Sequence, residues 1–362
     1  MKLKILDKYL IKQFLRIILF GIVTFSLLFI VIDLMENLDD FIDQKVPTFI
    51  VVKYYAVFLP EIIRLILPIA VLLAALFTSS RMANLNELTA IKSSGVSLYR
   101  YMTPFVVTSL MISLIAVYFG GYIVPEANKR KVQIEQTYMK KGLVFIGSNI
   151  FFQDTRTRIV NINHYDVDNN QAYQISIQNF DPQNTTKMTS RIDAFRMEYD
   201  STKKVWNLFS GTERIFTDTN ETYKKFTSLQ MNDLHFKPED VIKKQQKPEE
   251  MTLSELKNFA NEQLKTGNDP TQILIDYHSR IAFAFASLVV VLFGIPISTN
   301  KRKGGIALQF GINLTITFIY LVFAKISEAF GKNGVMNPFF TAWFANFIFL
   351  LAALFNIYRV QK

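Results

Sequence analysis

Two charged residues, Glu61 and Arg64, lie within a largely apolar stretch at residues 50–79. Residues three apart share one face of a helix, so these two side chains can form an ion pair. An unpaired charge in the middle of a bilayer costs about 2.5–3.5 kcal/mol on insertion scales. Two interpretations remain open: a self-neutralised pair that packs against another helix, or a contact with a charged substrate or a gating partner.

The sequence shows no recognisable reaction centre or metal site. His164 and His235 lie in a polar region without an HExxH motif, so we interpret both as surface residues. The chain has no cysteine, which excludes disulfides and thiolate metal sites. It also has no GxxxxGK[ST] loop, so any ATP-driven process must use an ATPase on another chain. We therefore expect no cofactor and no catalytic residues.

Long apolar stretches indicate how the chain is organised. A helix of roughly 20 apolar residues crosses the core of a bilayer, and three such stretches stand on either side of a long polar segment. We predict a helical membrane protein of three plus three spans, with an N-terminal half at 1–124, an inserted domain at 125–270 and a C-terminal half at 271–362. The spans are expected at about 14–34, 50–79, 105–124, 275–298, 306–327 and 339–358.

The formal net charge of +10 gathers at the ends of these spans. Residues 125–270 hold 21 Lys and Arg against 20 Asp and Glu, whereas the membrane part holds 19 against 10. A nucleic-acid binder would gather its excess on a soluble face, so no nucleic-acid partner is expected. The two termini and the loops at 80–104 and 299–305 hold 13 cations, and the opposite loops hold at most four. Positively charged loops stay in the cytoplasm, which puts both termini there and residues 125–270 in the periplasm.

The inserted segment alternates polar and apolar residues with a period of two, which is typical of short strands in a sandwich, roll or barrel. An open sheet edge there could pair with a partner's strand or shelter an acyl chain. A helix at about 253–266 is predicted from the capping-box pattern Thr252–Glu255 and from the stop at Gly267. Strands are expected at 158–163, 173–178, 187–199, 204–209, 212–217 and 225–231, with a hairpin turn at 200–203.

The segment at 84–95 predicts a short helix at the cytoplasmic surface. Asn84 or Asn86 could cap it and Gly95 could end it. Its apolar residues recur at helical spacing, so it could dock in a groove of a cytosolic protein, or it could be an ordinary interfacial helix. The apolar stripe consists of Leu85, Leu88 and Ile91.

Several short motifs, taken in order, resemble one known family over nearly the whole length of the chain. They are Leu6-Asp7-Lys8-Tyr9-Leu10, Asn86-Glu87-Leu88-Thr89-Ala90 with Gly95, Pro125-Glu126-Ala127-Asn128, His278-Ser279-Arg280 and Ile295-Pro296-Ile297-Ser298. The chain resembles the permeases of lipopolysaccharide-export ABC transporters, the LptF/LptG type. The opening motif and Asp33 lean toward the G type.

The resemblance implies a jellyroll-like β domain, inner-membrane localisation and four kinds of partner. These are a cytosolic ATPase dimer, a second permease of the same family, a single-span periplasmic transfer protein, and lipopolysaccharide as the substrate. The 84–95 segment would be the coupling helix, and Glu87 would pair with a basic residue of the ATPase. Spans one, two and five would line a lipid cavity, although residues 17–35 contain no Lys or Arg. The nearest candidates for contacts with the lipid are Lys45, Lys53 and Arg64, together with Glu61.

Two other classes of function are weighed against export. A membrane scaffold could use the β domain only to recruit periplasmic partners. An intramembrane lipid-modifying enzyme would need polar catalytic groups at matched depth in the spans. The charged residues found there, Glu61 with Arg64 and Lys325 with Glu328, are spaced as pairs and not as a reaction centre.

Overall fold

The computed structural model describes residues 4–139, 148–166, 169–201, 203–217, 220–238, 241, 247–266, 269–298 and 305–360. The chain divides into two compact units. The helical unit comprises residues 1–134, 252–257 and 271–362, and the second unit comprises residues 135–251 and 258–270. The predicted basic loop at 301–303 and the predicted helix stop at Gly267 lie outside the described residues.

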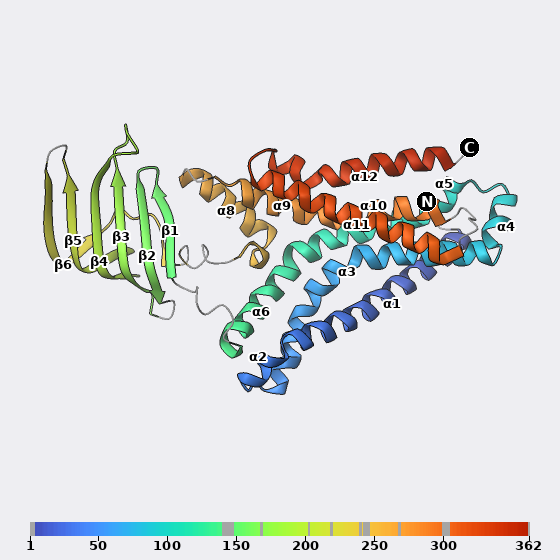
Figure 1. The fold of residues 1–362 in the computed structure, drawn as a ribbon, viewed down its shortest axis with the longest axis horizontal. Coiled ribbons are helices and arrows are strands. Elements are labelled where there is room, and N and C mark those ends of the chain that lie inside the picture. The colour runs from blue at the N-terminus through green and yellow to red at the C-terminus, as the bar shows by residue number, and fades with distance from the viewer. Residues whose placement is uncertain are drawn as a thin grey trace. The chain divides into compact units, whose positions relative to one another are not determined.

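Six helices of the described chain are long and apolar enough to cross a membrane, which confirms the predicted number of spans. They occupy Ile5–Glu36, Thr48–Asn84, Leu98–Tyr138, Thr271–Pro296, Leu314–Lys332 and Pro338–Arg359. Figure 1 shows α1 beside α3, and α11 beside α12, within the helical unit. The second and fourth of these helices are mostly buried by the others, whereas the first, fifth and sixth expose most of their surface.

The helices of the first half are α1 (Ile5–Glu36), α2 (Leu38–Asp43), α3 (Thr48–Asn84), α4 (Glu87–Ser93), α5 (Leu98–Tyr118) and α6 (Val124–Tyr138), with a π-helical turn η1 (Phe119–Ile123) between the last two. The later helices are α8 (Leu253–Thr266), α9 (Thr271–Ala284), α10 (Ala286–Ser298), α11 (Gly305–Lys332) and α12 (Pro338–Val360), with a short 3₁₀ turn η2 (Pro248–Glu250) before them.

The third membrane helix is longer at both ends than its apolar residues predict. It begins at Leu98, and residues 125–138, which the sequence assigns to the inserted domain, continue it as α6. Hydropathy marks only the lipid-facing part, while a polar segment without a helix breaker can extend the helix into water. Pro125 stands directly after the π-helical turn η1, near the start of α6, and does not end the helix. The expected loop at 80–104 is likewise mostly helical, with Arg81 in α3 and Arg100 in α5.

The inserted unit contains one antiparallel sheet whose strands lie in chain order, which confirms an all-β insertion between the third and fourth spans (Figure 1). The sheet is consistent with a jellyroll-like domain. Its strands are β1 (Ser148–Thr155), β2 (Arg158–Asp166), β3 (Gln171–Phe180), β4 (Met188–Asp200), β5 (Val205–Phe216) and β6 (Glu221–Met231).

The two strands expected at 204–209 and 212–217 are a single strand, β5. The pair Ser210-Gly211 suggests a turn in the sequence, and Ser210 does adopt a positive φ of 53°. The structure uses this conformation for an irregularity inside the strand and not for a reversal of the chain. Gly211 is required there because an added Cβ would lie 2.5 Å from the carbonyl oxygen of Asp193 on β4.

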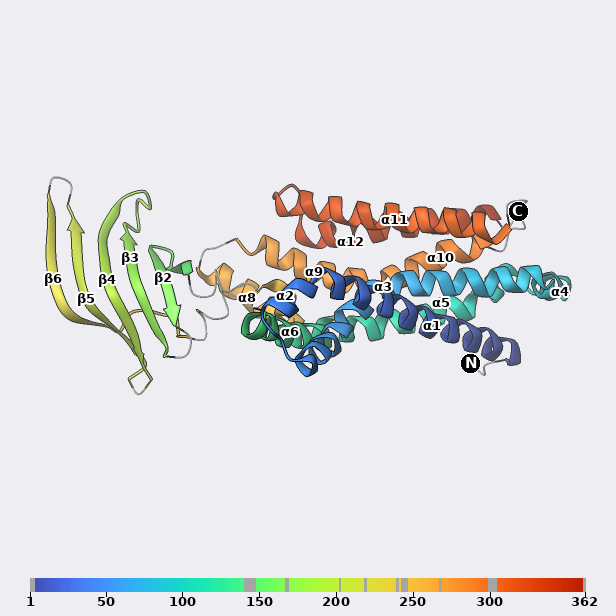
Figure 2. The ribbon, with the colours of Figure 1, turned by 60° about the horizontal axis from the view of Figure 1, so that its bottom comes forward.

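A line of irregular pairing crosses the sheet from β2 to β6. On β2, β3 and β4 the inward-facing residues are three apart at this line and not two, as between Ile162 and Tyr165 on β2. The residues at the line are Asn163, Gln174, Phe195, Ser210 and Thr227, which fall between the paired residues of neighbouring strands. One residue of each strand lies opposite one of the next, so the register is the same on both sides of the line. The strands curve along their length (Figure 2).

Trp206 lies at the centre of the core that covers the inner face of the sheet. It is 1% exposed and packs with the rings of Tyr199 and Phe236. Its indole N–H donates to the carbonyl oxygen of Phe236 at 2.8 Å. The segment after β6 is thereby held against the apolar side of the sheet.

Candidate functional site

The predicted surface helix is present as α4. Asn86 stands at the N-cap position with a left-handed φ of 59°, and its side chain makes no capping hydrogen bond. Gly95 follows the helix with a φ of 80°, and its N–H donates to the carbonyl oxygen of Lys92 at 3.0 Å. Glu87 lies in the first turn, where its carboxylate accepts a hydrogen bond from the hydroxyl of Tyr9 at 3.4 Å.

The apolar stripe of α4 divides between two environments. Leu88 is 4% exposed and belongs to the main core cluster of the helical unit, and Ile91 packs against that cluster. Leu85 lies before α4, at the end of α3, and is 57% exposed. The stripe therefore attaches α4 to its own membrane helices, and only Leu85 is available to a partner. A force applied to α4 reaches the core through Leu88.

An ion pair between Asp7 and Arg100 joins the beginnings of α1 and α5. The Asp7 carboxylate, which is 3% exposed, accepts from Arg100 Nη2 at 2.7 Å and from the backbone N–H of Lys4 at 3.0 Å. In the sequence Asp7 is only part of a motif, and no local pattern predicts the pair because 93 positions separate the two residues.

Glu61 and Arg64 form the ion pair that their spacing permits. Arg64 donates to the carboxylate through Nε at 3.0 Å and through Nη2 at 2.5 Å, and both side chains are mostly buried. The guanidinium also lies 6.0 Å from the ring of Phe283 on α9. The geometry is that of a self-neutralised pair packed against another helix.

Replacing Arg64 with alanine should destabilise the helical unit by about 3 kcal/mol, because the Glu61 carboxylate would remain without its counter-ion among apolar groups. The double variant Glu61→Gln with Arg64→Gln removes both charges and should recover most of this loss. Size-exclusion chromatography of samples heated in detergent gives the folded fraction at each temperature and so measures the stability of the single and the double variant. Equal destabilisation by the single and double variants would contradict the pairing account.

The other predicted cations do not join this pair. Lys45 is exposed in the turn after α2, and Lys53 is exposed on α3, roughly 16 Å along the helix axis from Arg64. Another cation, Lys131 of α6, lies 3.9 Å from the ring centre of Phe58. That contact joins α6 to α3, and no local signal in the sequence predicts it.

An ion pair between Lys129 and Glu255 joins the start of α8 to α6. The backbone N–H of Thr252 donates to the Glu255 carboxylate at 2.7 Å, and the N–H of Glu255 donates to the Thr252 hydroxyl at 3.3 Å, which is the predicted capping box. Lys129 donates to the same carboxylate at 3.0 Å. Burial raises the pKa of Glu255, but the hydrogen bonds from Thr252 and Lys129 outweigh it and hold the pKa below its ordinary value of 4.5.

This lowered pKa predicts the sign of a pH effect. A carboxyl whose folded pKa lies below its unfolded pKa contributes stability above the unfolded value, and loses it as the pH falls through the folded value. Thermal unfolding of the wild type and of Glu255→Gln, followed by circular dichroism, should therefore differ most near neutral pH. The difference should shrink below pH about 4, and a difference that stays constant down to pH 3 would contradict it.

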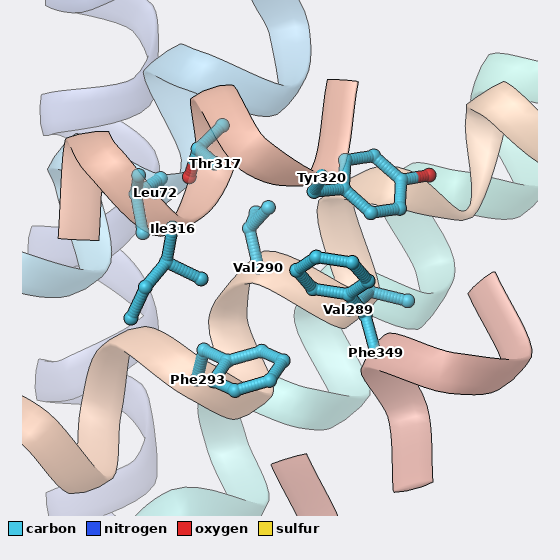
Figure 3. Close-up of a pocket in the computed structure, with 8 residues that line it drawn as sticks. All are labelled: Leu72, Val289, Val290, Phe293, Ile316, Thr317, Tyr320 and Phe349. Carbon is cyan, nitrogen blue, oxygen red and sulfur yellow. The ribbon is translucent and has the colours of Figure 1, made fainter. Parts of the chain in front are cut away.

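A small apolar cavity of about 10 Å³ lies within the helical unit between α3, α10, α11 and α12 (Figure 3). Val289, Val290 and Phe293 of α10 form one wall. Thr317 and Tyr320 of α11 face them. No charged side chain lines the cavity, so it offers no reaction centre.

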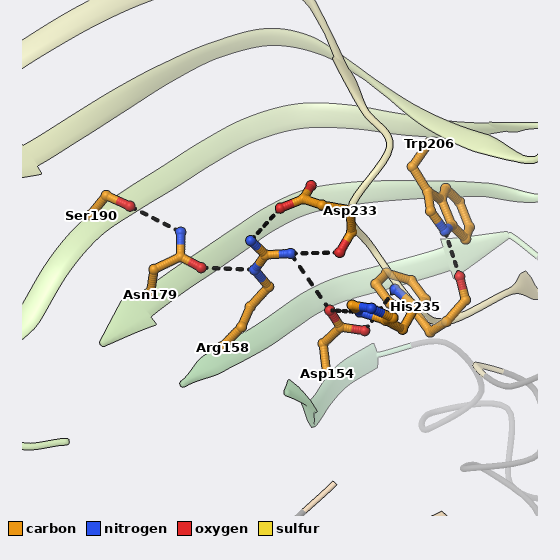
Figure 4. Close-up of polar contacts among 8 residues, drawn as sticks. Asp154, Arg158, Asn179, Ser190, Trp206, Asp233 and His235 are labelled. Carbon is orange, nitrogen blue, oxygen red and sulfur yellow. Dashed lines mark hydrogen bonds and ion pairs between the residues drawn. The ribbon is translucent and has the colours of Figure 1, made fainter. Parts of the chain in front are cut away.

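A polar cluster in the β unit holds the segment that follows β6 (Figure 4). The Asp154 carboxylate is 1% exposed and accepts from the backbone N–H of His235 at 3.0 Å, with the ring Nδ1 3.4 Å away. Arg158 bonds both the carboxylate and the carbonyl oxygen of Asp233. The His235 ring is 70% exposed and His164 is exposed. Among the described residues no group of His, Cys, Asp and Glu could hold a metal ion.

Six apolar helices with an antiparallel β unit between the third and the fourth define a multi-pass membrane protein with an inserted domain. A family model described as lipopolysaccharide export system permease LptF/LptG matches residues 8–359. The chain therefore belongs to the LptF/LptG family of permeases. The family description covers both types of subunit, so the leaning toward the G type stays a prediction. A search of curated proteins found no match.

Proposed function

We propose that this chain is a permease subunit of an ABC transporter that extracts lipopolysaccharide from the outer leaflet of the inner membrane. The β unit passes the lipid to a periplasmic bridge protein, and a separate cytosolic ATPase dimer supplies the energy. A second permease of the same family completes the lipid cavity. The family match over residues 8–359, which spans both membrane halves and the insert, is the observation that carries this proposal.

The position of α4 supports the coupling step. Its first turn presents Glu87 beside the exposed Leu85, while Leu88 is buried in the core of the helical unit. In the proposal ATP binding closes the ATPase dimer, which pushes α4, and the core transmits the push to the spans. The cavity between the two permeases then narrows, and the lipid leaves toward the β unit.

Co-purification from native membranes, with partners and bound lipid identified by mass, tests this function. Export predicts recovery of an ATPase and a second permease, and ATP hydrolysis that lipopolysaccharide stimulates after reconstitution. Recovery of periplasmic partners without an ATPase would favour the scaffold, and lipid turnover without ATP would favour the enzyme.

The proposed orientation has a separate test. Both termini lie in the cytoplasm and the β unit lies in the periplasm, so in sealed inside-out vesicles the region around Trp206 faces the lumen. Added protease should leave that region intact. Cleavage near Trp206 in vesicles that remain sealed would overturn the export account.

A further inference from the structure

The fourth span is broken at Phe285, between α9 and α10. The N–H of Phe285 donates to the carbonyl oxygen of Ala282, three residues back, at 3.1 Å. The same oxygen accepts from the side-chain amide of Asn346 on α12 at 2.8 Å. A side chain inserted into the helix hydrogen-bond ladder is a recognised cause of a kink, and it replaces the bond that the backbone loses.

Asn346 is itself held by a third helix. Its amide oxygen accepts from the hydroxyl of Tyr320 on α11 at 2.5 Å, and both residues are buried. Tyr320, Asn346 and the Ala282 carbonyl therefore form a polar chain across three spans in an apolar region. A buried polar chain of this kind favours one arrangement of the break over others.

The broken span borders a small cavity on each side. One side of α10 lines the apolar cavity shown in Figure 3. A second cavity, also of about 10 Å³, is lined by Phe283, Ala284 and Ser287 together with groups of α3 and of the third span. The Ser287 hydroxyl is buried without a hydrogen-bond partner. Each cavity is about the size that one water molecule needs, so any movement of α10 also displaces the side chains that line them.

The third span is irregular beside the same cavity. Its π-helical turn η1 contributes Phe119 and Gly120 to the lining. A Cβ added at Gly120 would lie 3.3 Å from Cδ of Arg64, so the two spans approach closely there. Single π-helical turns within longer helices occur frequently at functional sites.

The cytoplasmic half of α10 packs where α4 is attached. Val291 and Ile295 of α10 belong to the same core cluster as Leu88 of α4 and Met82 of α3. All four side chains are at most 4% exposed. A displacement of α4 can therefore reach α10 through α3, which contacts both helices.

We propose that α10 acts as a lever: it rotates as a rigid helix about a pivot at Phe285. The hydrogen bonds of Asn346 to Tyr320 and to the Ala282 carbonyl oxygen hold α10 in its resting position. Movement of α4 displaces Val291 and Ile295 by way of α3, and α10 turns about Phe285. The driving force rests on the proposed function, whereas the pivot is a property of this chain alone.

The pivot is tested without partners by hydrogen exchange of the full chain in lipid nanodiscs. Amides of residues 286–298 should exchange faster than those of 271–284. Asn346→Leu should raise exchange around the break by about tenfold, the equilibrium equivalent of one lost hydrogen bond. Tyr320→Phe should raise hydrogen exchange around the break by a smaller factor. If Asn346→Leu fails to fold, the exchange measured in Tyr320→Phe tests the pivot in its place.

Ser327→Ala is the matched control, because the Ser327 hydroxyl donates to the carbonyl oxygen of Thr341 at 2.7 Å between α11 and α12, away from the break. It should leave exchange at 286–298 unchanged. Equal exchange in α9 and α10, with no response to Tyr320→Phe or Asn346→Leu, would overturn the pivot.

The lever is tested in the reconstituted complex with Val290→Phe, which enlarges a buried side chain of α10 beside the first cavity. This variant should keep the ATPase bound and lower lipid release per ATP hydrolysed several-fold. Val322→Phe on α11, where the valine is 40% exposed, makes the same change in size and is the control. Unchanged coupling in Val290→Phe would overturn the lever. Failure of any ATPase to bind the wild type would instead contradict the proposed function and leave the exchange result intact.

Discussion

Replacing Glu87 with lysine should reduce recovery of the cytosolic ATPase by at least about tenfold, since truncating or reversing one charge of a buried interfacial pair costs about 2–5 kcal/mol. The carboxylate lies in the first turn of α4, where an acidic group suits the helix dipole and a lysine opposes it. Leu88 remains in the core, so the variant should still insert and fold. Affinity purification of the tagged permease with its ATPase measures the effect.

Glu36→Lys is the matched control for that experiment. It makes the same charge change at an exposed residue in the last turn of α1. Tyr9, whose hydroxyl donates to Glu87, lies near the beginning of the same helix. ATPase recovery should equal that of the wild type. Undiminished recovery with Glu87→Lys would show that the ATPase does not depend on this carboxylate.

Replacing Trp206 with alanine should lower the free energy of unfolding of the β unit by about 3–5 kcal/mol. The indole is 1% exposed, so its loss leaves a cavity, and the carbonyl oxygen of Phe236 loses its donor. Pulse proteolysis of the full chain in increasing urea measures the cleaved fraction of the β unit.

Phe195→Ala tests whether burial causes the loss at Trp206. Phe195 is a large aromatic residue of the same sheet, but its side chain is 61% exposed. Its removal should change the free energy of unfolding by less than about 0.5 kcal/mol. Similar urea profiles for the two variants would contradict the assignment of Trp206 to the core.

The number of spans and the strands of the insert were predictable because hydropathy and residue alternation are local properties of the sequence. Hydropathy located six spans because lipid requires long apolar runs, and alternation with a period of two indicated the strands. The same signals misplaced boundaries. Residues 125–138 are polar but helical, and Ser210-Gly211 indicates a turn but lies within β5.

The candidate site was predictable only where its residues are close in sequence. The spacing of Glu61 and Arg64 predicted their contact, and Gly95 predicted the end of α4. The Asp7–Arg100 pair and the hydrogen bond between His235 and Asp154 join residues 93 and 81 positions apart. Such contacts depend on how helices and strands pack, which residue spacing does not encode. For the apolar stripe of α4, the spacing predicted the stripe but not what the stripe contacts. Helical spacing alone does not say whether an apolar face packs against a partner or against the core of its own chain.

The irregular line across the sheet limits how the domain can change during evolution. Because the pairing of β2 to β6 is interrupted at the same level, with one residue of each strand opposite one of the next, deleting one residue from a single strand would exchange its two faces beyond that point relative to its neighbours. Related domains should therefore gain or lose such residues as a set. Single-residue indels should instead accumulate in the hairpin connections.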